Sequence, residues 1–227
     1  MGKVSANGLC SKQHILHLLY ATLFLLPLNP FLFYITLLPA IGAWLYNWKR
    51  QKEVGLSLPP LWQMGAVFLL CSFLSAFVSK NTAFSLMNWA LQPLMYGLLY
   101  LLIYTTVSTE KEKEKALYAF LAGAVVTVAY GFFQYANAAG MAADMEAQSW
   151  VDPERFPLLR RRMYSTLENP NLFGAYLLMM ISILTAFTLR EKAVKRKTVF
   201  AGILLALLLC LALTYSRGAW VSLAAIV

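Results

Sequence analysis

Arginine residues at two places in this 227-residue chain are the side chains best suited to chemistry. Arg160, Arg161 and Arg162 directly precede the segment Met-Tyr-Ser-Thr-Leu-Glu-Asn-Pro-Asn, and Arg217 lies within Thr-Tyr-Ser-Arg-Gly-Ala-Trp. A guanidinium offers a planar fork of donors that matches the oxygens of a phosphate group. Both places predict an anion site. The alternatives are pairing of the cluster with lipid headgroups or nearby acids, and snorkelling of Arg217 to the membrane surface.

The elements that position these arginines are predicted to be transmembrane helices. Hydrophobic residues make up 60% of the chain and charged residues 13%, whereas soluble domains have roughly 45–50% and about 25%. The composition predicts an all-α, polytopic transmembrane helical bundle that forms a single domain over residues 1–227. The net charge of +9 is attributed to lysines in cytoplasmic loops, so membrane lipids and no nucleic acid are the expected partners.

Apolar segments predict about seven spans and the beginning of an eighth. Residues 15–46 are broken by Pro27-Leu28-Asn29-Pro30, which favours a hairpin of two short helices over one kinked helix. The other predicted spans are residues 61–78, 86–107, 116–135, 172–189 and 199–213. Residues 219–227 are too few to cross a bilayer. We therefore expect this sequence to be the N-terminal part of a longer protein.

The distribution of positive charge predicts the orientation of these spans. With the hairpin, thirteen of the nineteen lysine and arginine residues share one side with the N-terminus, and the positive-inside rule makes that side cytoplasmic. The outer side of the cytoplasmic (inner) membrane then carries the loop of residues 136–171 and Arg217. Ten of the thirteen inner basic residues are lysine, whereas five of the six outer ones are arginine.

Polar residues around the arginines are predicted to support an anion. Asn169, Pro170 and Asn171 predict the cap of a transmembrane helix, whose free N–H groups and dipole favour negative charge. Ser165 and Glu168 lie in the same segment, and Ser216 directly precedes Arg217. Glu168 could orient an arginine or receive a proton from an acceptor, or it could simply interact with the helix dipole. No cysteine or histidine spacing predicts a metal site.

The two motifs together resemble the O-antigen ligase and polymerase superfamily. An arginine-rich lead into Tyr-Ser-Thr-x-x-Asn-Pro-Asn-x-x-Gly-x-Tyr-Leu is followed, two predicted helices later, by Thr-x-Ser-Arg-Gly-Ala-Trp, within residues 155–227. The resemblance implies a multi-helix membrane glycosyltransferase of cell-surface polysaccharide biosynthesis. Such an enzyme moves a glycan from undecaprenyl pyrophosphate onto a hydroxyl of a glycan or lipid acceptor, at the outer face of the cytoplasmic membrane, without metal or cofactor.

By this resemblance Arg162 and Arg217 match the arginines that hold the donor diphosphate, and Arg161 is the alternative to Arg162. The catalytic residue stays unknown. Members of the family have a histidine in a later outward loop, and this chain ends before such a loop. Its only histidines, His14 and His17, begin the first predicted span. The alternative functions are a transporter for a small anion and an inactive N-terminal remnant.

Overall fold

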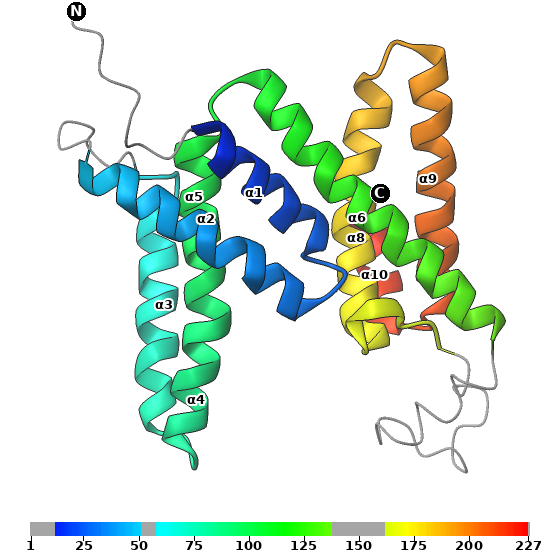
Figure 1. Ribbon diagram of the computed structural model, residues 1–227. Coiled ribbons are helices and arrows are strands. Elements are labelled where there is room, and N and C mark those ends of the chain that lie inside the picture. The colour runs from blue at the N-terminus through cyan, green and yellow to red at the C-terminus, as the bar shows by residue number, and fades with distance from the viewer. Residues whose placement is uncertain (1–11, 51–57, 138–161, 227) are drawn as a thin grey trace, which may run out of the picture. The chain divides into compact units, whose positions relative to one another are not determined.

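The computed structural model describes residues 12–50, 58–137 and 162–226, and the regular elements among them are all helices (Figure 1). This confirms the predicted all-α class. Arg160, Arg161 and most of the loop of residues 136–171 lie outside the described residues. Contacts group the chain into two compact units. The first unit comprises residues 1–23 and 31–118, and the second comprises residues 24–30 and 119–227.

Five helices in the described part of the chain are long and apolar enough to cross a membrane, fewer than the seven predicted spans. They are Pro30–Lys49, Thr82–Thr106, Glu110–Ala136, Pro170–Arg190 and Val194–Leu213. Helices α1 (Lys12–Leu25) and α3 (Trp62–Phe77) have 14 and 16 residues. At 1.5 Å per residue they are about 21 and 24 Å long, less than a hydrocarbon core of roughly 30 Å.

The predicted break in the first apolar region is present. Helix α1 ends at Leu25, and α2 (Pro30–Arg50) begins with a proline, which has the fixed φ of a first helical residue and needs no N–H partner there. Within the first unit, the hydroxyl of Thr22 donates to that of Thr36 at 3.0 Å and joins the two helices. The region is therefore a pair of helices and not one kinked helix.

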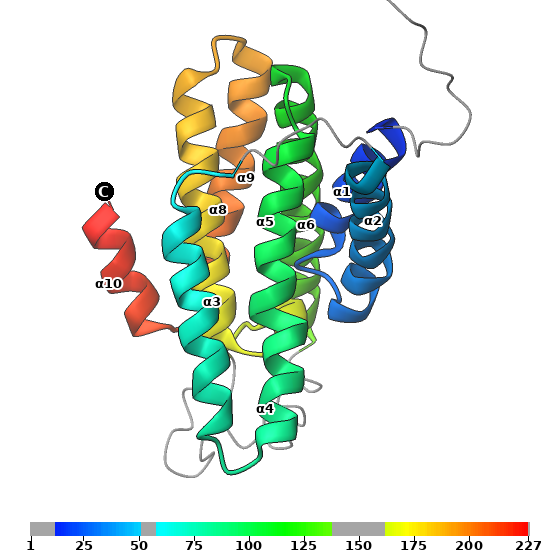
Figure 2. The same cartoon turned by 90° about the vertical axis from the view of Figure 1, so that its left-hand side faces the viewer.

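The rest of the first unit is a helical hairpin. Helix α3 lies beside a continuous helix made of α4 (Thr82–Trp89), the π-helical segment η1 (Ala90–Leu94) and α5 (Met95–Thr106) (Figures 1 and 2). The indole of Trp89 donates to the carbonyl of Leu69 and the hydroxyl of Ser72, both at 3.1 Å. The π-helical turn contains Pro93, as expected where a proline displaces the carbonyl four residues earlier.

Helix α6 (Glu110–Ala136) begins with a reciprocal cap. The backbone N–H of Glu112 donates to the hydroxyl of Thr109 at 3.2 Å, and the N–H of Thr109 donates back to the Glu112 carboxylate at 3.0 Å. This is the capping box, which satisfies N–H groups that a helix start otherwise leaves free. The ammonium of Lys12 also pairs with Glu112 at 2.9 Å, so α1 and the start of α6 are joined in the first unit.

The second unit combines the later part of α6 with α8 (Pro170–Arg190), α9 (Val194–Leu213) and α10 (Arg217–Ile226). Helices α8 and α9 form an antiparallel hairpin (Figures 1 and 2). Their buried side chains recur at helical spacing: Leu177, Met180 and Leu184 on α8, and Leu207 and Leu211 on α9. Such a stripe keeps the two helices in register and fixes where their ends meet.

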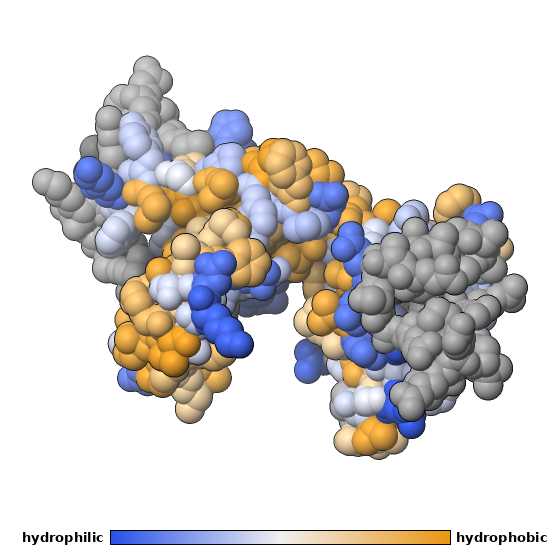
Figure 3. Space-filling view, turned by 90° about the horizontal axis from the view of Figure 1, so that it is seen from below, coloured by the Kyte–Doolittle hydropathy of each residue, from blue (hydrophilic) through white to orange (hydrophobic). Residues whose placement is uncertain are grey.

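Large apolar side chains remain exposed along the outer sides of the helices. Val67, Leu70 and Phe133 are examples, and broad apolar patches are visible in the space-filling view (Figure 3). In water such surfaces would favour aggregation, whereas lipid tails are as apolar as the side chains themselves. The exposed surface therefore agrees with a membrane protein.

Candidate functional site

Residues 162–169 connect to helix α8 and are held by hydrogen bonds from helix α6. The backbone N–H of Ser165 donates to the side-chain oxygen Oε1 of Gln134 at 2.9 Å. The hydroxyl of Ser165 donates to the backbone carbonyl of Thr127 at 2.6 Å. Both bonds are buried, so losing either would leave a polar group without water. Gln134 and Thr127 thus attach the segment to α6.

Two further bonds attach this segment elsewhere in the second unit. The N–H of Met163 donates to the carbonyl of Leu213 at 2.9 Å, at the end of α9. The hydroxyl of Thr166 donates to the carbonyl of Pro27 at 2.5 Å.

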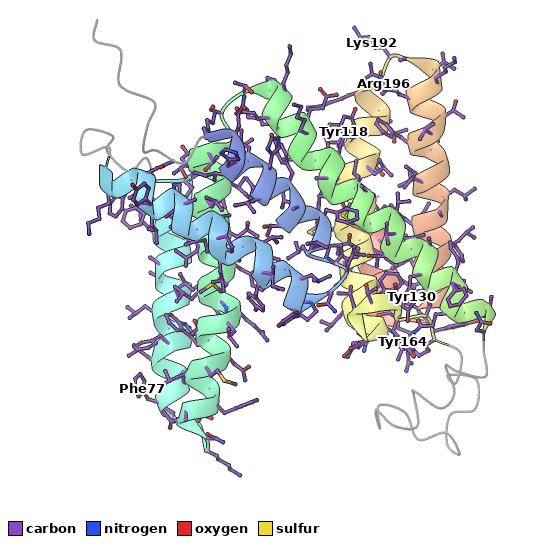
Figure 4. The ribbon with its side chains drawn as sticks, in the orientation of Figure 1. Phe77, Tyr118, Tyr130, Tyr164, Lys192 and Arg196 are labelled. Atoms are coloured by element: carbon purple, nitrogen blue, oxygen red, sulfur yellow. The ribbon has the colours of Figure 1, made fainter. Side chains whose placement is uncertain are left out.

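Tyr164 and Tyr130 lie at one end of the second unit, and Lys192 and Arg196 lie at the opposite end of the α8–α9 hairpin (Figure 4).

Asn169 caps helix α8, as its position before Pro170 predicted. Its side-chain oxygen accepts from the backbone N–H groups of Asn171 at 2.8 Å and Leu172 at 3.2 Å. Pro170 occupies the first turn, where a missing N–H costs nothing. This cap fixes the point at which the chain enters α8 and therefore where the side chain of Asn171 lies.

Arg162 joins the two sequence motifs. Its Nε donates to the backbone carbonyl of Thr214 at 2.8 Å, and its Nη2 donates to the side-chain oxygen of Asn171 at 2.8 Å. Only 9% of the residue is exposed. A buried guanidinium held by two neutral acceptors keeps its full charge, because arginine stays protonated in proteins. The contacts orient the charge without neutralising it.

Arg217 is the second cation of this site. It is the first residue of α10, with an exposed side chain. Burial and, second to it, the positive charge of Arg217 lower the pKa of Arg162. Neither arginine forms an ion pair with a carboxylate in the part of the chain that the structure describes. Two interacting like charges, one of them desolvated, make a place where an anion would be stabilised.

Backbone strain is concentrated around the two arginines. Among the described non-glycine residues, four have positive φ, and three of them are Ser165 at 55°, Glu168 at 56° and Tyr215 at 50°. Such conformations cost about 1–3 kcal/mol each, persist only when the surroundings impose them, and cluster at functional sites. Here the imposing contacts include the two hydrogen bonds that Ser165 donates to α6.

Two glycines allow close approach of the elements that carry the arginines. A Cβ added at Gly174 on α8 would lie 3.1 Å from the Cβ of Ala219 and 3.3 Å from that of Ser216. One added at Gly131 on α6 would lie 3.1 Å from the sulfur of Met163. The glycines therefore let α10 rest on α8 and let the segment before α8 rest on α6.

The structure brings most of the predicted site residues together. Arg162, Asn169 and Asn171 are linked as described, and Ser216 is buried, with its N–H donating to the Thr214 hydroxyl at 3.2 Å. Glu168 is exposed and forms no ion pair with Arg162 or Arg217, the two arginines of the site that the structure describes. Arg161 lies outside the described residues.

Sequence reasoning missed three residues that accept hydrogen bonds from the site: Gln134, Thr127 and Thr214. Gln134 does carry a sequence signal, because polar side chains in apolar spans often form hydrogen bonds across helices. Its partner is instead the backbone of Ser165. Thr127 and Thr214 act through their carbonyls, and a carbonyl gives no sequence signal.

No group of three or more His, Cys, Asp or Glu residues that could hold a metal ion occurs within the described ranges. His14 and His17 are exposed on α1 in the first unit, whereas the arginine site belongs to the second unit.

No protein-family model, curated protein or solved structure matches this chain.

Proposed function

We propose that this chain binds the diphosphate of a lipid-linked glycan with Arg162 and Arg217, as the donor site of an O-antigen ligase-like membrane glycosyltransferase. The observation that carries the proposal is the buried guanidinium of Arg162, which Thr214 and Asn171 orient and which interacts with the charge of Arg217. An anion that bridges both arginines would remove the repulsion between them and replace lost hydration.

A diphosphate suits this arrangement because it carries several negative charges on many acceptor oxygens. Nη1 of Arg162 and the whole guanidinium of Arg217 have no acceptor among the described residues, so both can donate to a ligand. In glycan transfer, the bond between the sugar and the diphosphate oxygen breaks and its electron pair leaves with the diphosphate. The oxygen of an acceptor hydroxyl bonds to the sugar, and that hydroxyl releases its proton. Arginine charges fixed in advance would stabilise the departing lipid diphosphate.

The proposed setting is the cytoplasmic membrane, with the arginine end of the second unit outside and the N-terminus inside. Support comes from the opposite end of the α8–α9 hairpin, where Lys192 and Arg196 lie (Figure 4). Lysine-rich turns are favoured on the cytoplasmic side. Undecaprenyl pyrophosphate is the proposed lipid carrier, and a glycan or lipid hydroxyl is the proposed acceptor.

Transport of a small anion is less well supported by the same geometry. Transporters bind substrate near the middle of the membrane, at broken helices. Arg162 instead lies before the first turn of α8, and Arg217 follows the end of α9. A site at helix ends suits a headgroup at the membrane surface.

Binding of farnesyl diphosphate to the purified chain in detergent micelles tests the proposal by calorimetry, with farnesol as the uncharged comparison. Arg162→Gln and Arg217→Gln should each weaken the affinity roughly 10- to 100-fold, as expected for a charged hydrogen bond worth about 1.5–3 kcal/mol. Arg190→Gln is the matched control, because Arg190 is exposed in the last turn of α8. Equal affinity for farnesol, or equal loss in the control, would exclude a diphosphate site at these arginines.

A further inference from the structure

We propose that Gln134 is a positioning residue for Arg162, acting through the strained backbone of Ser165. The part of this inference that concerns ligand binding rests on the proposed function. The part that concerns the conformation of Ser165 and Arg162 does not. Gln134 lies near the end of α6, far in sequence from both motifs, and is buried. Its Oε1 accepts the N–H of Ser165 at 2.9 Å.

Ser165 is the residue through which this contact acts. Its φ of 55° lies in the left-handed region, which a residue with a Cβ avoids unless its surroundings hold it there. Ser165 donates two hydrogen bonds to α6, one from its backbone N–H to Gln134 and one from its hydroxyl to the carbonyl of Thr127. The two bonds hold the residue on both sides of its α-carbon. Without the bond from Gln134, Ser165 would relax toward negative φ.

Relaxation of Ser165 would move Arg162, because few residues separate them and the intervening ones are buried. Met163 and Tyr164 are 0% and 4% exposed. Met163 packs where Gly131 on α6 leaves room, and its N–H reaches Leu213. A change of φ at residue 165 therefore disturbs the packing of Met163 and breaks the alignment of Arg162 with Thr214 and Asn171.

The signature of this role is rescue by glycine. Glycine adopts positive φ without steric cost, so a chain carrying Ser165→Gly no longer needs Gln134 to hold the segment. Alanine also removes the Ser165 hydroxyl but retains the Cβ. A merely structural role of Gln134 would not distinguish glycine from alanine at position 165.

The first readout is farnesyl diphosphate affinity in micelles. Gln134→Met should weaken binding about tenfold, within the range expected for one buried hydrogen bond. Adding Ser165→Gly should restore the affinity to that of Ser165→Gly alone, whereas adding Ser165→Ala should not. Unchanged affinity in Gln134→Met, or equal effects of glycine and alanine, would overturn the inference. Failure of the unaltered chain to bind farnesyl diphosphate would instead count against the proposed function.

The second readout needs no ligand. Met163→Cys is placed in a chain whose Cys10, Cys71 and Cys210 are replaced by alanine, and its reaction with a water-soluble maleimide is timed. Gln134→Met should speed labelling severalfold, and Ser165→Gly but not Ser165→Ala should slow it again. Equal rates with and without Gln134 would overturn the positioning role whether or not the diphosphate binds. A melting curve for each variant identifies any that fails to fold.

Discussion

Nη2 of Arg162 donates a 2.8 Å hydrogen bond to Oδ1 of Asn171, in the first turn of α8. The bond ties the end of the arginine-rich segment to the helix that follows it. Since Nε of Arg162 is already committed to the Thr214 carbonyl, the two contacts together fix the plane of the guanidinium. A planar donor fork binds phosphate oxygens well only when its plane is set in advance.

Asn171→Ala should weaken farnesyl diphosphate binding roughly three- to tenfold, because the Arg162 guanidinium would lose one orienting acceptor worth about 0.5–1.5 kcal/mol. The fold should be little affected, since residue 171 is exposed. Asn137→Ala is the control, because Asn137 is exposed and its side-chain amide donates only to the carbonyl of Phe133 in the described residues. Equal affinities of both variants would mean that Asn171 does not orient Arg162.

Asn169→Ala and Asn81→Ala remove comparable helix caps from the two units. The Asn81 side chain accepts from the N–H of Phe84 at 3.1 Å at the start of α4. Each substitution should cost about 1 kcal/mol of stability. Only Asn169→Ala should also weaken diphosphate binding, because its cap positions Asn171. Thermal melting and calorimetry together separate the two effects, and weaker binding in Asn81→Ala would contradict this account.

Gly174→Val should displace α10 from α8, because even a Cβ at this position would meet Ala219 and Ser216 at 3.1 and 3.3 Å. Overpacking of this kind costs about 1–3 kcal/mol, and Arg217 should move with α10. Gly202→Val on α9 is the control, since a Cβ there meets nothing within 4 Å. A normal melting temperature and normal diphosphate affinity in Gly174→Val would show that this contact is not needed.

Arg217→Gln should slightly stabilise the chain in the absence of ligand at low salt, because it removes a positive charge that acts on buried Arg162. The gain should be a few tenths of a kcal/mol and should fade in high salt, as for other exposed charges. Melting temperatures at two salt concentrations measure it. Destabilisation would instead indicate a carboxylate partner for Arg217.

Local chemistry made part of this structure predictable from sequence. The cap at Asn169 and the break between Leu25 and Pro30 follow from side chains that act on their own backbone, and the structure contains both. Glu168 shows the limit of local reasoning. Its charge beside an arginine cluster left three roles open, namely orienting an arginine, receiving a proton or interacting with the helix dipole. The structure adds that its side chain is exposed and its backbone left-handed.

Tertiary contacts made the rest unpredictable. Nothing in the order of residues indicates that Arg162 reaches the Thr214 carbonyl or that Gln134 accepts from Ser165. Seven spans were predicted, and five helices among the described residues are long and apolar enough to cross a membrane, because hydrophobicity alone does not tell where a helix ends. Helix α3 stops at Phe77 after 16 residues, although the apolar character of the region predicted a full span.

The most direct test of the central claim is a double-mutant cycle of Arg162→Gln and Arg217→Gln, with farnesyl diphosphate affinity as the readout. If one diphosphate bridges both arginines, the double variant should lose less affinity than the two single losses multiplied together, with a coupling of about 1 kcal/mol or more. Independent, multiplicative losses would contradict a shared ligand. Binding by the double variant as tight as by the unaltered chain would contradict the site itself.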